Sequence, residues 1–168
     1  MQNPVTGGFS GNLGPSDAHI TTLGWLNFLA SYCPLHQNFS AAMLSQLFAP
    51  AINNDCVRLF KNDDGYVCAA LIWAQLSDDV SERMVFDRVP PKPSEWITGS
   101  NLWFLDVIAP FKHGRMIASH IARNPPDGPF FFARLGESGA IRKVVRGDAS
   151  HRSKRIQVFQ IDPEKGAN

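Results

Sequence analysis

Three features are missing or scarce in this chain of 168 residues, and each absence excludes a class of protein. No run of 18 apolar residues occurs, so we expect no helix that spans a membrane. The N-terminus has neither a basic flank nor an apolar stretch, so no secretory signal is expected. Cysteines are few, odd in number and without metal-ligand spacing, which favours reduced thiols and a cytoplasmic location; they are Cys33, Cys56 and Cys68.

What is present is typical of a globular domain with a sizeable core. Hydrophobic residues make up 44% of the chain and aromatic residues 11%, which argues against disorder. We expect a loose N-terminal arm over residues 1–16, rich in Gly, Pro, Ser and Asn, and a single domain over residues 17–168. The net charge of +1 hides an asymmetry, because residues 1–100 carry five Lys/Arg against nine Asp/Glu, whereas residues 101–168 carry eleven against six.

Hydrophobic periodicity and turn residues predict an α+β fold, with a mixed sheet flanked by helices. The first helix is expected over residues 23–31 with Thr22 as its N-cap, and the second is expected to follow Ser40 with Met43 on its buried face. A hairpin is expected from residues 56–60 and 66–76, and a third helix after the N-cap Ser77. Later elements are a central strand, a helix and three strands, at residues 102–108, 115–123, 130–135, 141–145 and 155–161.

Two polar residues stand out against this background. Asp106 lies in the middle of the central strand, which is otherwise apolar on both faces, so its carboxylate requires a partner. His36 lies in a short connection between two helices, where an imidazole would be held in a fixed position. Each residue also has an ordinary interpretation, because Asp106 could cap a helix or hold a turn, and a histidine in a loop is more often a surface residue.

Four segments stand out by their order and spacing: Cys33-Pro-Leu-His36, Pro50-Ala-Ile52, the predicted strand at residues 66–77 and the segment Trp96–Phe111. Together they resemble one family, the RTX toxin-activating lysine acyltransferases. The resemblance runs from about Leu23 to Phe111 and is weaker in the C-terminal part. It implies a GNAT-like fold with a splayed central sheet. It also implies a cytoplasmic bacterial enzyme that moves a fatty acyl chain from acyl carrier protein to internal lysines of an RTX protoxin, which activates that haemolytic toxin.

The family's essential histidine and aspartate fall on His36 and Asp106. Lysine has a pKa of about 10.4 and must lose a proton before it attacks, so the reaction needs a base. We predict that His36 is this base, or the acid for the leaving thiol, and that Asp106 fixes its tautomer. Cys33 stands where relatives usually have serine, so a covalent acyl-cysteine relay is a second interpretation.

No bound cofactor or metal is expected, and the donor substrate would be the acyl-phosphopantetheine of acyl carrier protein. The segment after Phe111 lacks the Gly-rich loop that binds the pyrophosphate of coenzyme A in acetyltransferases of this fold. Carrier proteins are acidic, and six basic residues could form a matching face: Lys112, Arg115, Arg123, Arg142, Lys143 and Arg146. A solvated basic surface is the alternative for each of them.

Two other functions remain open at this point. One is a GNAT-like, coenzyme A-dependent N-acetyltransferase acting on another amine, and the other is a non-catalytic escort that binds a protoxin. A zinc site is not expected, because the histidines lack Cys or carboxylate at ligand spacing. Nucleic-acid binding is not expected either, since the basic third carries no known motif. Apolar residues on the late strands leave a homodimer open.

Overall fold

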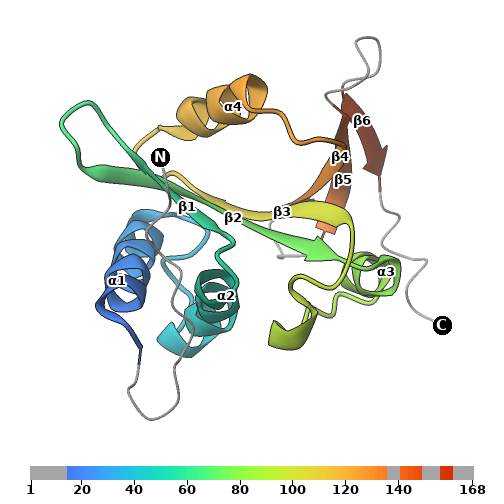
Figure 1. Cartoon of the computed structure of the whole chain (residues 1–168), viewed down its shortest axis with the longest axis horizontal. Helices are drawn as coiled ribbons and strands as arrows, with labels where there is room; N and C mark the ends of the chain where they lie inside the picture. The colour runs from blue at the N-terminus through green and yellow to red at the C-terminus, as the bar shows by residue number, and fades with distance from the viewer. Residues whose placement is uncertain (1–14, 136–140, 149–155, 161–168) are drawn as a thin grey trace. The chain divides into compact units, whose positions relative to one another are not determined.

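The computed structural model describes residues 15–135, 141–148 and 156–160, and within them the chain forms an α+β fold with a mixed sheet (Figure 1). The predicted fold class is therefore confirmed, whereas its GNAT-like detail stays a prediction. In chain order the elements are α1 (Asp17–Tyr32), α2 (Ala41–Asn53), β1 (Val57–Lys61), β2 (Val67–Leu76), α3 (Asp78–Phe86), the 3-10 helix η1 (Pro93–Glu95), β3 (Asn101–Ile108), α4 (Gly114–Arg123), β4 (Pro129–Leu135), β5 (Ile141–Asp148) and β6 (Ile156–Gln160).

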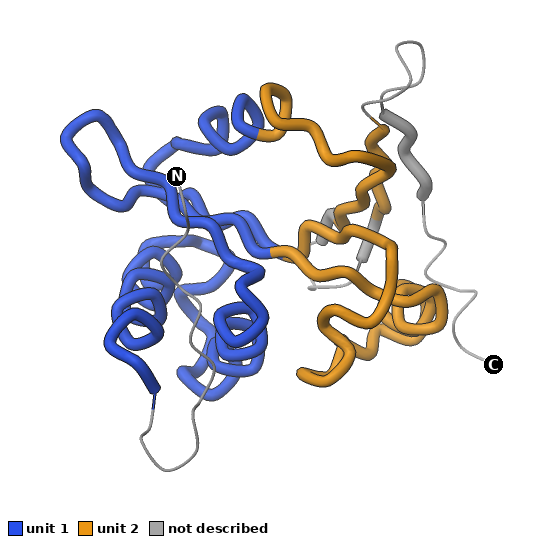
Figure 2. Tube along the Cα trace, viewed as in Figure 1, with its two compact units in different colours: residues 1–72, 106–120 blue, residues 73–105, 121–168 orange. Residues whose placement is uncertain are grey.

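The chain divides into two compact units, which Figure 2 shows in different colours. Unit 1 comprises residues 1–72 and 106–120, and unit 2 comprises residues 73–105 and 121–168. The boundary between the units falls inside β2 and inside β3, so each of these strands contributes to both. His36 and Asp106 belong to the same unit, unit 1. The prediction of one domain over residues 17–168 and a loose arm before it stays a prediction.

Unit 1 is built on a two-helix layer and a hairpin. Helices α1 and α2 pack against each other, and Figure 1 shows both on the same side of β1 and β2. These two strands pair antiparallel, with Val57 opposite Ile72, as the hairpin prediction required. The turn uses Gly65 at φ 85°, a conformation that glycine adopts without strain. The fully buried side chains Leu26, Leu29, Phe48 and Ile72 form the core of this unit.

Serine caps fix where the helices begin. The predicted N-caps Ser40 and Ser77 are confirmed, because their side chains accept hydrogen bonds from the backbone N–H of Met43 and Val80. The predicted start of the first helix was wrong. Ser16 caps α1 six residues before Thr22, which lies inside the helix and is buried.

Two predictions of burial were also wrong in part. Met43 was placed on the buried face of α2, but it lies in the first turn and its side chain is exposed. The central strand was expected to be covered on both faces. In β3 only Trp103 and Ile108 are buried, and Val107 is exposed.

Unit 2 contains the strands at the C-terminal end of the sheet, whose full order is β1-β2-β3-β4-β5-β6. Strand β3 pairs parallel with β4 through Leu102 to Phe104, and α4 provides the crossover between them. Strands β4, β5 and β6 continue as antiparallel neighbours. Of the three tryptophans in this unit, two donate their indole N–H: Trp96 to the carbonyl of Trp73 at 2.9 Å and Trp103 to Ser81 Oγ at 3.0 Å. These bonds satisfy the polar atoms of large buried rings.

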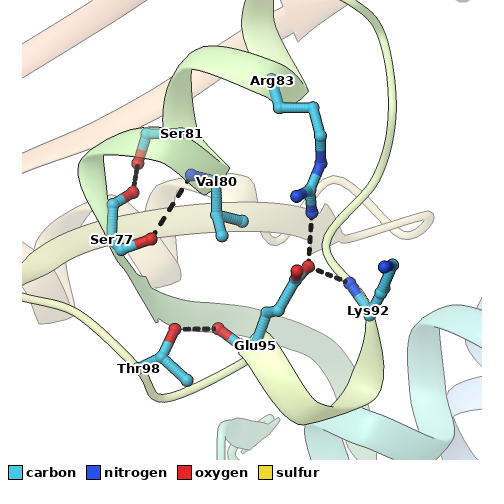
Figure 3. A network of polar contacts seen from close by, with 7 residues as sticks. All are labelled: Ser77, Val80, Ser81, Arg83, Lys92, Glu95 and Thr98. Carbon is cyan, nitrogen blue, oxygen red and sulfur yellow. Dashed lines mark hydrogen bonds and ion pairs between the residues drawn. The ribbon is translucent and has the colours of Figure 1, made fainter.

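A polar network holds the proline-rich segment before β3 against α3 (Figure 3). Glu95 accepts hydrogen bonds from the guanidinium of Arg83 and, at 2.8 Å, from the backbone N–H of Lys92. Thr98 Oγ1 donates to the carbonyl of Glu95 at 2.9 Å. The bonds from Arg83 and Lys92 hold the pKa of Glu95 below its usual value. The proline-rich segment that begins at Pro90 is thus tied down by side chains at its end.

Gly99 packs directly against the backbone of Leu76 and Ser77. We expect Gly99→Ala to destabilise the fold by about 1–3 kcal/mol or more. A Cβ at this position would lie 2.2 Å from backbone atoms of Leu76 and Ser77, which cannot rotate away as a side chain can. The Gly99 N–H also donates to the carbonyl of Gln75 at 3.0 Å, so the loop cannot move without losing that bond. Urea denaturation monitored by circular dichroism measures the change.

Gly24→Ala is the matched control, because a Cβ at Gly24 would meet no described atom within 4 Å. Position 24 is in the interior of α1, where alanine is favoured over glycine by about 0.5–1 kcal/mol, so this variant should be slightly more stable than the parent chain. Equal stability of the two variants would contradict the close packing of Gly99.

Candidate active site

The connection between α1 and α2 holds His36 in a compact turn. Helix α1 ends at Tyr32, and the carbonyl of Cys33 accepts hydrogen bonds from the N–H groups of His36 and Gln37, both at 2.9 Å. The Phe39 N–H donates to the carbonyl of His36 at 2.9 Å, immediately before the cap of α2. Pro34 favours this arrangement because it cannot continue the helix. The imidazole is therefore mounted on a short turn with both ends fixed.

The imidazole of His36 meets the carboxylate of Asp106 across 70 residues of chain. Nε2 of His36 lies 2.7 Å from Oδ2 of Asp106, a short distance for a hydrogen bond between a nitrogen and a charged oxygen. The side chain of His36 is 2% exposed and that of Asp106 is 10% exposed. Strand β3 supplies the aspartate two residues before its end at Ile108, at the position where the strand passes from unit 2 into unit 1. The carboxylate within the sheet thus has a partner.

Burial and charge act in opposite directions on this histidine. Burial lowers the pKa of His36, but the hydrogen bond and the negative charge of Asp106 outweigh burial. Cys33 adds a smaller effect in the same direction as Asp106. The pKa of His36 therefore rises from 6.5 to about 9. At neutral pH the ring is therefore mostly an imidazolium that donates its Nε2–H to Asp106. Only roughly one ring in a hundred is neutral at pH 7.

The second ring nitrogen is the one left for chemistry. Among the residues that the structure describes, Nδ1 of His36 is buried and has no partner at normal hydrogen-bond geometry. Asp106 holds the proton on Nε2, so loss of a proton from the imidazolium leaves the lone pair on Nδ1. The pair can therefore accept a proton at Nδ1 and return it, which is what general acid and base catalysis requires.

Two neighbours complete the surroundings of the ring. Cys33 is a buried free thiol that is close enough to influence the charge of His36. Phe39 contacts the imidazole edge-on, with ring centroids 5.5 Å apart. The contact of Phe39 with the histidine was not predicted from the sequence. Aromatic residues beside a helix cap give no signal of that kind.

The six residues of the predicted basic face are divided between the two units. Lys112 and Arg115 lie in unit 1, in and after the turn between β3 and α4, and both are exposed. Arg123, Lys143 and Arg146 lie in unit 2, and the side chain of Arg142 is outside the described residues. Lys143 and Arg146 point to opposite faces of β5, because they are separated by an odd number of positions along the strand. Arg146 also contacts Asp148 at 3.4 Å.

The described residues offer neither a metal-binding cluster nor a membrane-spanning helix. No cluster of three or more His, Cys, Asp or Glu side chains there could hold a metal ion. None of the helices described has the length and apolarity needed to cross a bilayer.

Comparison with known proteins places the chain in a family. The model of the RTX toxin acyltransferase family matches residues 16–160, which is most of the chain. The chain belongs to the RTX toxin acyltransferase family. Its members are acyltransferases, and the resemblance seen in the sequence is confirmed.

Individual relatives of the RTX toxin acyltransferase family are similar over most of the chain. The RTX-II toxin-activating lysine-acyltransferase ApxIIC of Actinobacillus pleuropneumoniae is 34% identical over 107 residues, which cover 64% of this chain and 66% of the relative. The protein-lysine myristoyltransferase RtxC of Kingella kingae is 31% identical over 140 residues, covering 83% and 76%. The protein-lysine myristoyltransferase HlyC of Escherichia coli is 29% identical over 125 residues, covering 74% and 73%.

Proposed function

We propose that this chain is a protein-lysine fatty acyltransferase that activates an RTX protoxin, with His36 and Asp106 as its catalytic pair. The observation that carries the proposal is the 2.7 Å contact between a buried histidine and a largely buried aspartate, two chemically complementary side chains, in a member of this family. Relatives are named for toxin activation and for transfer of a myristoyl group to protein lysine. The substrate proposed here is therefore an internal lysine of a protoxin, and the reaction takes place in the cytoplasm.

The proposed reaction replaces a thioester with an amide. The Nζ of the substrate lysine, once neutral, attacks the thioester carbonyl carbon, and the carbon–sulfur bond breaks as the carbon–nitrogen bond forms. His36 accepts the amine proton at Nδ1 and gives a proton to the leaving thiolate. Asp106 keeps the other ring proton on Nε2 and stabilises the imidazolium that exists between these two transfers. A thioester is already activated, so positioning and proton transfer are the enzyme's main contributions.

The donor that we propose is acyl carrier protein rather than coenzyme A, with no other cofactor. The turn between β3 and α4 contains Lys112 at φ 65° and is followed by exposed Arg115 in the first turn of α4, in place of a Gly-rich loop that would cradle a pyrophosphate. Positive charge at this turn favours an acidic carrier protein, and it lies in the same unit as His36. The other four basic residues proposed for this face belong to unit 2: Arg123, Arg142, Lys143 and Arg146.

Mass spectrometry of a protoxin co-expressed with this chain tests the proposal. A lysine that gains a long acyl mass, and only when this chain is present, is the expected result. An acetyl mass would instead indicate an acetyltransferase, and a protoxin that binds the chain without modification would indicate an escort. Either of these outcomes would overturn the proposed function. Purified acyl carrier protein and acyl coenzyme A, each carrying the same chain, then identify the donor by the initial rate of transfer.

Cys33→Ser separates direct transfer from a covalent relay. We expect this variant to keep the acylation rate within about threefold, because the chemistry above needs only proton transfer by His36. Serine also keeps a small polar group at the end of α1, so the fold should be retained. The measurement is the initial rate of acylation together with intact-protein mass after a donor pulse. Loss of the rate about 100-fold or more, with an acyl group trapped on the parent Cys33, would establish the relay instead.

A further inference from the structure

A cluster of exposed aromatic side chains lies on unit 1. Phe28 is 44% exposed, Tyr32 58% and Phe111 40%. Their ring centroids are 5.1 Å apart for Phe28 and Tyr32, 5.6 Å for Tyr32 and Phe111, and 6.3 Å for Phe28 and Phe111. Single exposed apolar residues are common, but large aromatic rings that contact one another while exposed indicate a binding surface.

The cluster continues along one face of α1 as an apolar stripe, defined as Ile20, Gly24, Phe28 and Tyr32 together with Phe111. The four helical positions are spaced by four residues, so they lie on one face and span roughly 18 Å along the helix axis. All four are exposed, and a side chain built at Gly24 would meet nothing described within 4 Å. The opposite face of α1 is buried in the core through Leu26 and Leu29. The outer face of α1 is therefore apolar although it does not pack in the core.

One end of the stripe lies on the two chain segments that carry the proposed catalytic pair. Tyr32 immediately precedes Cys33, whose carbonyl accepts the hydrogen bond from the His36 N–H. Phe111 follows Asp106 by five residues in the turn after β3. The two segments that bring His36 and Asp106 together therefore also bring Tyr32 and Phe111 together at 5.6 Å. The other end, at Ile20, leads away from the site toward the start of α1.

We propose that this stripe binds the hydrocarbon chain of the acyl donor, with the thioester near His36 and the methyl end toward Ile20. The inference rests on the proposed function and adds the surface that recognises its donor. An uncharged hydrocarbon chain suits the stripe because the stripe contains no Asp, Glu, Lys, Arg or His. The length of the stripe is also of the same order as that of an extended long-chain acyl group. A second copy of the chain fits less well, since three half-exposed rings offer roughly 300 Å² of aromatic surface, whereas a stable interface buries about 800 Å² on each partner.

Chain-length dependence of the transfer rate tests the proposal. In Gly24→Glu a carboxylate is placed in the stripe at an open helical position, and Phe28→Ser removes one ring. We expect the rate with a myristoyl donor to fall about tenfold or more in both variants, through a higher KM for the donor, while the rate with an acetyl donor is unchanged. The matched controls, Ser45→Glu on exposed α2 and Phe86→Ser in unit 2, should keep the parent profile. Rates that fall equally for both donors, or that stay within twofold for myristoyl, would overturn it.

A binding measurement keeps the inference separate from the enzymatic activity. Trp25 contacts Phe28 with ring centroids 6.0 Å apart, so myristic acid brominated near its methyl end should quench tryptophan fluorescence when it binds the stripe. Saturable quenching in the parent chain and in Ser45→Glu, lost in Gly24→Glu, is the expected result even if no lysine acylation is found. Quenching that is absent, or equal in all three proteins, would overturn the proposal. A parent dimer that Phe28→Ser converts to a monomer, seen by light scattering, would also overturn it by assigning the stripe to a subunit interface.

Discussion

His36→Ala is expected to lower the rate of lysine acylation about 10²–10⁴-fold. The substitution removes both nitrogens of the only imidazole that contacts Asp106 in the described part of the chain, and with them the group that accepts and returns the proton. The side chain is buried, so some stability is lost as well, and rates must be expressed per folded molecule. The measurement is the initial rate of transfer from a saturating acyl donor to a protoxin fragment, followed by intact-protein mass.

His19→Ala serves as the matched control for this variant. His19 is also a buried histidine in unit 1, but its ring nitrogen Nδ1 lies 2.8 Å from Oγ of Ser16, at the start of α1 and away from Asp106. We expect this variant to lose stability while it keeps the parent rate per folded molecule. Equal rate losses in the two variants would show that His36 acts through the fold rather than through the reaction.

Local sequence signals predicted the hairpin and the helix after Ser77 well, because a Gly-containing turn and a serine cap determine those structures within a few residues. The start of α1 was mispredicted for a related reason. Ser16 and Thr22 are both capable caps, and the choice between them depends on which side chain is buried in the folded unit. Thr22 faces the core, which a local pattern does not reveal.

The proposed catalytic pair shows the same division between local and long-range information. The positions of His36 in a turn and of Asp106 in a strand followed from nearby residues, but their contact joins segments 70 residues apart. Periodicity carries no information on such a contact, and the pairing was expected only because the surrounding segments resemble a family. The exposed rings of Phe28, Tyr32 and Phe111 were not predicted at all, because an apolar residue in a helix is ordinarily assigned to the core.

Asp106→Asn is expected to lower the acylation rate by about 10²–10⁴-fold at neutral pH, and also to change its pH dependence. In the parent chain burial lowers the pKa of His36, and the hydrogen bond and charge of Asp106 outweigh burial and raise it to about 9. An uncharged amide removes the charge and no longer requires a proton on Nε2. The pKa of His36 should therefore fall from about 9, while the tautomer with a free Nδ1 is no longer enforced. The ring becomes neutral more readily, yet it is a weaker base that is often in the wrong tautomer.

The pH profile separates these effects from a loss of structure. For a base with a raised pKa, the parent rate should increase with pH up to about 9, and in Asp106→Asn the inflection should move to lower pH. The stability of the fold also depends on pH through the pKa of His36. Because the folded pKa of His36 lies above its unfolded value, the stabilisation by Asp106 is complete below about 6.5 and is lost as pH rises through about 9. The variant should thus be least stable relative to the parent in mildly acidic solution and approach it above pH 9. An inflection that stays near 9 in the variant would mean that a group other than this aspartate sets the charge of His36.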